Sequence, residues 1–157
     1  MSDALYESDF YAWTREQALA LRARRPGAND IDYDRVAEEI QEMGSEVRHA
    51  CESYVRLIIE HLFKLCSTRA VYPVEHWRSE VGTFRTNLDV RLTPSITNML
   101  RSDLDRLHEE AAKRAVKGFR KTEPGAPVDT GLRWTWDQIT GDAEDDPLDR
   151  DYPLPHG

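Results

Sequence analysis

The feature that most constrains this chain is a run from residue 33 to residue 67 in which apolar side chains recur every three or four positions. This period places them on one face of a helix and does not fit a β-strand, whose period is two. Gly44 lies inside the run, and the sequence leaves open whether it bends the helix or breaks it. We therefore predict a long amphipathic helix that buries one face. The residues of that face are Tyr33, Val36, Ile40, Met43, Val47, Cys51, Tyr54, Ile58, Leu62 and Leu65.

Three further segments have the same period, and no strand pattern competes with them. They cover residues 6–22, residues 77–88 and the stretch from Ser95 to about Lys121. Thr93 suits the N-cap and Pro94 the first turn of the last segment, while Thr135 suits the cap of a short C-terminal turn. We predict an all-α, single-domain helical bundle of about four main helices over residues 1–140. An acidic, proline-containing, extended tail is predicted over residues 141–157.

Charge is distributed unevenly along the chain. The formal net charge is −8, which argues against nonspecific binding of nucleic acid. Beyond residue 140 the tail carries six carboxylates and one arginine. The dense basic run is "KRAVKGFRK", residues 113–121, which suits the C-terminal end of a helix dipole and is also a candidate acidic-partner or nucleic-acid patch. Because the tail and the basic run have opposite charge, they could mediate self-association or mask each other.

The apolar runs, the N-terminus and the two cysteines indicate the compartment and the redox state of the chain. No apolar run approaches the roughly 20 residues of a membrane span, and the N-terminus has neither the basic start nor the apolar stretch of a signal peptide. We predict a cytoplasmic protein. Cys51 and Cys66 lie on one predicted helix about 22 Å apart, too far to bond to each other, and are interpreted as small buried side chains.

Several segments, in order, resemble a known family. They are "LYESDFYAWTREQALALR", "IDYDRVAEEIQEMG", "HLFKL", Trp77-Arg78, "TPSI" and a C-terminal Trp-Thr-x-x-Gln element. This set is similar to a bacterial family catalogued as domain of unknown function twenty-nine. Leu65 stands where the family usually has Trp, and an acidic insertion precedes "DYPLP". The resemblance implies a single helical domain from a bacterium and implies no activity.

Two sets of residues could bind a metal ion. Glu46-x-x-His49 has the spacing of di-iron bundles, but on a helical wheel both residues point away from the buried face, so we expect a solvated charged face. His61, His76 and His108 come from separate helices and could converge on one metal ion, although their spacing does not predict it. We predict no metal and no cofactor.

A set of polar and aromatic residues is the candidate ligand site. On the wheel, His61 lies about 60° from the centre of the buried face and Glu60 about 160° away, on the solvent side. Asp9 lies on an apolar face and needs a partner, for which we expect Arg78 or His61. The set either ties three helices together or binds a ligand. It consists of Asp9, Trp13, Glu39, His61, Lys64, Trp77 and Arg78.

The functional prediction is a cytoplasmic binding or protein–protein interaction domain without catalysis of its own. Its partner is an unknown protein or a second copy of the chain, and nucleic acid is an unlikely ligand. The alternative is a small metal-dependent or hydrolytic enzyme that uses His61 with nearby carboxylates. No catalytic residue is predicted, because no nucleophile motif or phosphate-binding loop occurs.

Overall fold

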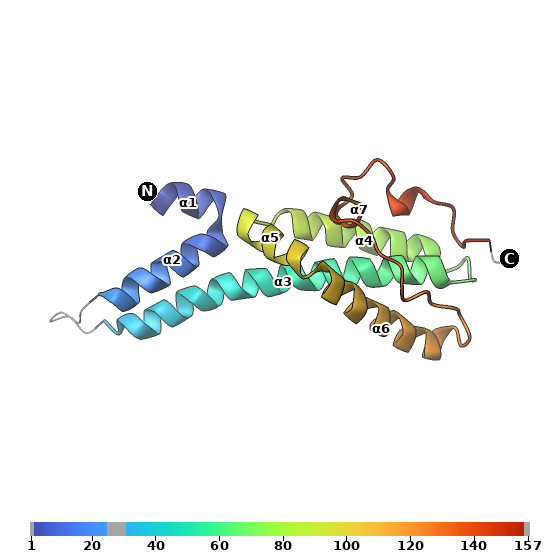
Figure 1. Ribbon diagram of the computed structural model, residues 1–157, viewed down its shortest axis with the longest axis horizontal. Helices are drawn as coiled ribbons and strands as arrows, with labels where there is room; N and C mark the ends of the chain where they lie inside the picture. The colour runs from blue at the N-terminus through green and yellow to red at the C-terminus, as the bar shows by residue number, and fades with distance from the viewer. Residues whose placement is uncertain (1, 25–30, 156–157) are drawn as a thin grey trace. The chain divides into compact units, whose positions relative to one another are not determined.

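The computed structural model describes residues 2–24 and 31–155, and its regular elements are helices (Figure 1). No strand occurs within these residues, which confirms the all-α prediction. None of the helices described is long and apolar enough to cross a membrane. The elements are α1 (Ser2–Ser8), α2 (Phe10–Ala23), α3 (Tyr33–Ser67), α4 (Val74–Asp89), α5 (Pro94–Ser102), α6 (Leu104–Thr122), α7 (Trp136–Thr140) and the short 3-10 helix η1 (Pro147–Asp149).

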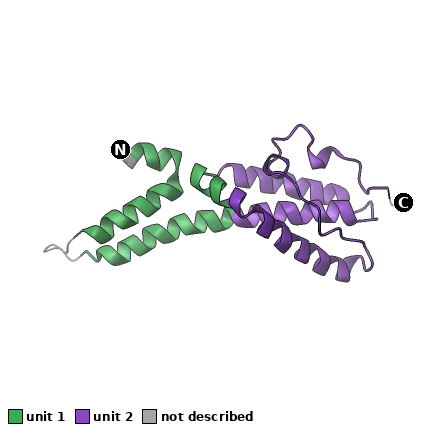
Figure 2. Cartoon of the chain, in the orientation of Figure 1, with its two compact units in different colours: residues 1–51, 91–99 green, residues 52–90, 100–157 purple. Residues whose placement is uncertain are grey.

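The chain forms two compact units, coloured separately in Figure 2. Unit 1 comprises residues 1–51 and 91–99, and unit 2 comprises residues 52–90 and 100–157. Helix α3 contributes its first half to unit 1 and its second half to unit 2. Residues 141–155 are grouped with unit 2, and 156–157 lie outside the described residues. The predicted division into a bundle and a tail at residue 140 stays a prediction.

Aspartates divide two of the predicted helices. The helix predicted over residues 6–22 is interrupted at Asp9, whose side chain accepts a hydrogen bond of 3.0 Å from the amide of Ala12 and caps α2. The helix predicted from Ser95 to Lys121 is interrupted at Asp103, which separates α5 from α6. Aspartate favours the position of Asp9, because its carboxylate can satisfy a free amide at a helix start, whereas the side chain of Asp103 pairs with Arg106 at 3.1 Å and caps no amide. Both single-helix predictions are therefore wrong.

Two predicted helix starts are confirmed. Pro94 is the first residue of α5, and Thr93 Oγ1 accepts a hydrogen bond from the amide of Ile96 at 3.3 Å. Thr135 caps α7 in a reciprocal arrangement with Gln138: each side chain accepts from the other residue's backbone amide.

Unit 2 has a broad core. Its second half of α3 is buried on most sides, which is typical of a helix surrounded by other elements rather than lying at a surface. The buried side chains of this core include Val55, Ile58, Ile59, Leu62, Phe63 and Leu65 of α3, Val81 and Leu88 of α4, Leu107, Ala111, Ala115 and Phe119 of α6, and Trp134, Trp136 and Ile139.

Small residues form the seam between α2 and α3 in unit 1, whose buried side chains also include Tyr11 and Ile96. Ala18 of α2, Ala37 and Cys51 of α3 are buried, and so is Gly44. A Cβ on Gly44 would lie 2.1 Å from Thr14 Oγ1, so α2 approaches α3 closely there. Helix α3 runs unbroken through this glycine.

The buried face predicted for the first half of α3 is wrong in part: Cys51 is buried, but two of its apolar residues are exposed. Val36 is 40% exposed and Met43 is 52% exposed. The seam against α2 uses the small residues on the adjacent face instead, because only they allow the close approach at Gly44. An apolar strip of α3 is therefore left on the surface.

Candidate functional site

The seven residues of the predicted site are divided between the two units. Asp9, Trp13 and Glu39 belong to unit 1, while the other four belong to unit 2. Trp13 packs with aromatic rings of its own region, at 4.9 Å from Tyr6 and 5.8 Å from Phe10 between ring centroids. Glu39 is exposed on α3.

Asp9 has two backbone partners. Its carboxylate accepts hydrogen bonds from the amides of Ala12 at 3.0 Å and Ser95 at 2.8 Å, so it joins α2 to α5 within unit 1. The expectation that Arg78 or His61 would pair with it is wrong. Burial opposes ionisation of Asp9, but the hydrogen bonds to both amides outweigh burial and lower its pKa below the ordinary 3.8.

His61 is 5% exposed and has partners on both ring nitrogens. Nδ1 donates to the carbonyl of Leu57 at 2.8 Å, and Nε2 lies 2.7 Å from Oε2 of Glu80 on α4. The same oxygen lies 3.5 Å from Nε2 of His76. A histidine ring between a carbonyl and a carboxylate is a satisfied structural group, and it joins α3 to α4.

The exposure of a neighbour of His61 also differs from the helical-wheel prediction. The side chain of Glu60 is 14% exposed and pairs with Lys64 at 3.0 Å, so its predicted solvent-side position is wrong. The wheel fails because this half of α3 is covered on more than one face. Lys64 also lies over the ring of Trp77, 6.0 Å from its centroid.

Arg78 holds the C-terminal segment. It donates to the carbonyl of Arg150 and lies over the ring of Tyr152, 5.6 Å from its centroid. Arg85 fixes the same segment through two hydrogen bonds to the carboxylate of Asp146, at 2.7 and 2.9 Å. Burial of Asp146 opposes ionisation, but the bonds from Arg85 outweigh it and lower the pKa of Asp146. The sequence analysis did not identify Arg85. The acidic tail was the available signal, because its carboxylates need cationic partners.

Of the two cysteines predicted to be buried, only Cys51 is fully so. Both are free thiols, with Cys51 buried and Cys66 half-buried. Burial raises the pKa of the Cys51 thiol to about 11 and also raises that of Cys66. A thiol whose pKa is raised is a poor nucleophile at neutral pH.

The Glu46-x-x-His49 motif faces solvent, as the wheel predicted: both residues are exposed. Within the described ranges, no three or more histidine, cysteine, aspartate and glutamate side chains are arranged to hold a metal ion.

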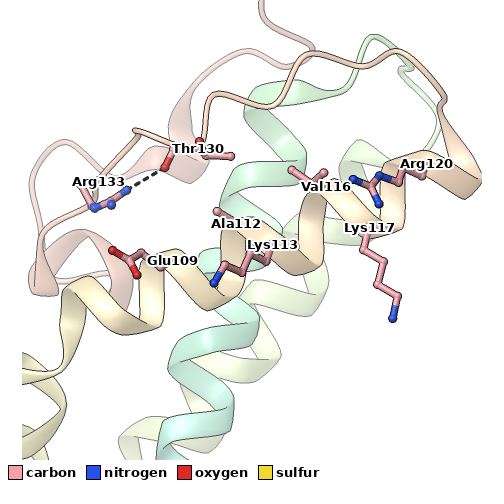
Figure 3. A pocket seen from close by; sticks show the side chains of 8 residues that line it. All are labelled: Glu109, Ala112, Lys113, Val116, Lys117, Arg120, Thr130 and Arg133. Atoms are coloured by element: carbon pink, nitrogen blue, oxygen red, sulfur yellow. Dashed lines mark hydrogen bonds between the residues drawn. The ribbon is translucent and has the colours of Figure 1, made fainter.

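A hollow in unit 2 lies between α6 and the segment that follows it (Figure 3). We call it the α6 groove. It has a volume of about 630 Å³, and a second hollow of about 220 Å³ continues it, sharing Val116 and Arg120. The α6 groove is lined by Glu109, Ala112, Lys113, Val116, Lys117, Arg120, Thr130 and Arg133, and the continuation adds Phe119, Gly125, Ala126 and Val128.

Two anchors hold the segment that forms the far wall of the α6 groove. At its start, Glu123 accepts hydrogen bonds from the Thr68 hydroxyl at 2.8 Å and the Arg69 amide at 2.7 Å. At its end, the amide of Trp134 donates to Nε2 of His108 at 3.0 Å. His108 is 1% exposed, and its Nδ1 donates to the carbonyl of Leu104. Burial lowers the pKa of His108, which keeps its ring neutral so that Nε2 can accept.

The α6 groove is basic at its rim and apolar at its floor. Four cationic side chains and one carboxylate line it. Lys113, Lys117 and Arg120 are exposed and have no ion pair or hydrogen bond to any residue that the structure describes. In Figure 3, Arg120 turns its guanidinium toward Val116, and Lys117 points away from the far wall. A surface of this kind suits a ligand that has both carboxylates and apolar groups.

The acidic tail does not neutralise these cations. Asp146 pairs with Arg85, Asp145 accepts from Gln138, and Asp142 accepts from Thr140. Sequence reasoning identified the basic run of residues 113–121 but not the far wall, which carries Thr130 and Arg133. No local pattern predicts that this irregular segment returns along α6, because its anchors are long-range hydrogen bonds.

Comparison with known proteins identifies the family but no activity. The model of the family described as domain of unknown function DUF29 matches residues 5–142, and the chain belongs to this family. No curated protein matches the chain. A crystal structure of an alpha-helical protein of unknown function from Rhodospirillum rubrum is similar to the chain, with 27% sequence identity, a TM-score of 0.77 and 92% of each chain covered.

Proposed function

We propose that this chain is a binding protein without catalysis of its own, and that its α6 groove binds an acidic, amphipathic segment of a protein partner. One observation carries the proposal: Lys113, Lys117 and Arg120 stand without partners among the described residues beside the apolar floor of an open groove. Basic residues also suit the last turn of a helix, but that explanation does not require a hollow with an apolar floor.

The shape and charge of the α6 groove favour a peptide segment over other anions. Its volume of about 630 Å³ suits a ligand with several side chains. The three cations recur at positions 113, 117 and 120, along one face of α6, so they match carboxylates that recur with helical spacing. The net charge of −8 would repel nucleic acid. The sugar-phosphate backbone of a nucleic acid also has no apolar side chains to pack against the apolar floor.

The test uses a designed helical peptide with glutamates on one edge and leucines beside them, labelled with fluorescein. Its binding to the full chain is measured by fluorescence anisotropy. Removing all three cations from the rim of the groove should weaken binding by about tenfold or more. The variant is Lys113→Ala/Lys117→Ala/Arg120→Ala.

The matched control removes two cations of the same helix that do not line the α6 groove, Arg114 and Lys121. Arg114→Ala/Lys121→Ala should bind the peptide within about threefold of the wild type, because exposed charges outside an interface contribute little. Equal losses in both variants would indicate nonspecific attraction and contradict the proposal. Absence of binding to the wild type would also contradict it.

The second candidate is an enzyme that uses His61 with a neighbouring carboxylate. The observation that favours it is the 2.7 Å contact between His61 and Glu80, with His76 near the same oxygen. Against it, both ring nitrogens of His61 are engaged within the fold. Metal analysis of protein purified without a histidine tag tests the metal-dependent form. Stoichiometric metal that is lost in His61→Ala would support it over the binding function.

A further inference from the structure

Unit 1 carries a surface with the chemistry that the α6 groove requires. We call it the α3 stripe, and it consists of Val36, Ile40, Met43 and Val47. Val36 and Met43 are 40% and 52% exposed, and the other two are half-buried. Their spacing of four, three and four residues is the pattern by which one helix packs along another.

The edge of the α3 stripe is acidic. Glu39 and Glu46 are exposed beside it, and Glu42 is exposed further round the helix. No ion pair or hydrogen bond links any of the three to another residue that the structure describes. The α3 stripe and its acidic edge therefore present apolar side chains and carboxylates on one helix. The proposed occupant of the α6 groove needs both.

The dimensions of the two surfaces agree. The α3 stripe runs from Val36 to Val47, and the α6 groove runs along its helix from Glu109 to Arg120. Each covers eleven residue steps, or about 16 Å of helix. The three carboxylates and the three cations each span seven residue steps, about 10 Å. The axial spacing therefore allows charge pairs along one contact between two helices.

We infer that the α6 groove binds the α3 stripe of a second copy of this chain. The inference rests on the proposed function and names its partner. Both surfaces are exposed in the chain, so each is available to another molecule. Since every copy carries both, one contact leaves one groove and one stripe free. The assembly closes if the two copies exchange contacts reciprocally, and otherwise it grows.

The acidic tail of a second copy is the competing occupant. It offers exposed carboxylates at Asp142, Glu144 and Asp149, but its apolar residues are less available: Pro147 is buried and Leu148 is half-buried. The α3 stripe is favoured, because it can fill the apolar floor of the α6 groove as well as neutralise its rim.

The experiment exchanges charge on the full chain and measures assembly by sedimentation velocity at micromolar concentration. The groove variant is Lys113→Glu/Lys117→Glu/Arg120→Glu, and the stripe variant is Glu39→Lys/Glu42→Lys/Glu46→Lys. Wild type should sediment as a dimer or larger assembly. Each variant alone should sediment as a monomer, because each then presents like charges on both surfaces. An equal mixture should associate, since opposite charges face each other in both contacts.

Nonspecific attraction does not explain association of the mixture. Each exchange changes the net charge of −8 by six, so both variants remain net negative and repel each other at long range. The matched control, Glu144→Gln/Asp149→Asn/Asp151→Asn, should assemble as wild type does. Circular dichroism confirms that each variant is folded.

The failures can be told apart. A monomeric wild type, a mixture that stays monomeric, or assembly abolished by the tail variant would each overturn the second-copy inference. If the designed peptide still binds the α6 groove in any of these cases, the proposed function stands. If the peptide does not bind the α6 groove either, both the proposed function and the second-copy inference are contradicted.

Discussion

The two halves of α3 have the same apolar spacing but different surroundings. In unit 2, Ile58, Leu62 and Leu65 are fully buried, with α4 joined to this half through His61 and Glu80. In unit 1, Val36 and Met43 remain exposed beside a seam of small residues. Helical periodicity thus identifies an apolar face, but it does not say whether the same chain or a partner covers that face.

The largest expected effect is a difference in the free energy of unfolding when one apolar residue on each half of α3 is truncated to alanine. Leu62→Ala leaves a cavity in the core of unit 2 and should lower the free energy of unfolding by about 3–4 kcal/mol. Met43→Ala removes a side chain that is half exposed and should cost below about 1 kcal/mol in the monomer. Urea denaturation at low protein concentration measures both. Equal costs would show that the stripe is buried within the chain.

A smaller effect tests the seam of unit 1. Gly44→Ala places a methyl group 2.1 Å from Thr14 Oγ1 and should destabilise the chain by about 1–3 kcal/mol. Gly82→Ala is the control, because it also lies in a helix but a Cβ there meets nothing within 4 Å. That change should stabilise the chain by up to about 1 kcal/mol.

A second change restores space at the seam. Thr14→Ala removes the hydroxyl that the new methyl would meet, so the double variant should be more stable than additivity of the two single variants predicts. Strict additivity in thermal unfolding would mean that α2 and α3 do not approach each other closely at this point.

The smallest effect is a pH dependence that belongs to unit 2. The pKa of His108 is lowered from its ordinary 6.5, so the unfolded chain binds a proton there before the folded chain does. The free energy of unfolding should therefore fall as the pH drops below about 6.5, toward the lower pKa of the folded state. Urea denaturation across this range measures the slope. The slope should be shallower in His108→Gln, and an unchanged slope would place the titration elsewhere.

The sequence predicted the local features of the fold well, because they depend on nearby residues. The all-α class, the start of α5 at Pro94, the capping of α7 by Thr135 and the exposure of His49 all follow from spacing and capping chemistry. The interruption at Asp9 was missed, because a capping aspartate and an aspartate on a helix face look alike in a periodic pattern.

The candidate site was predicted only in part, because it depends on long-range contacts. The basic run on α6 is visible in the sequence, but the wall opposite it is placed by His108 and Glu123 through hydrogen bonds to distant residues. The expected partner of Asp9 was wrong for the same reason: its partners are backbone amides, which every residue except proline carries, so the sequence does not mark them.

The measurement that tests the central claim most directly is a photo-crosslink from Met43. A benzoylphenylalanine in its place lies on the α3 stripe, where the side chain is 52% exposed. Irradiating a mixture of unlabelled and nitrogen-15-labelled chains, followed by mass spectrometry, separates crosslinks between copies from those within one copy. We predict crosslinks between copies that map to residues 109–133, which contain the α6 groove. Crosslinks confined to single copies, or mapped to residues 141–155, would contradict the account.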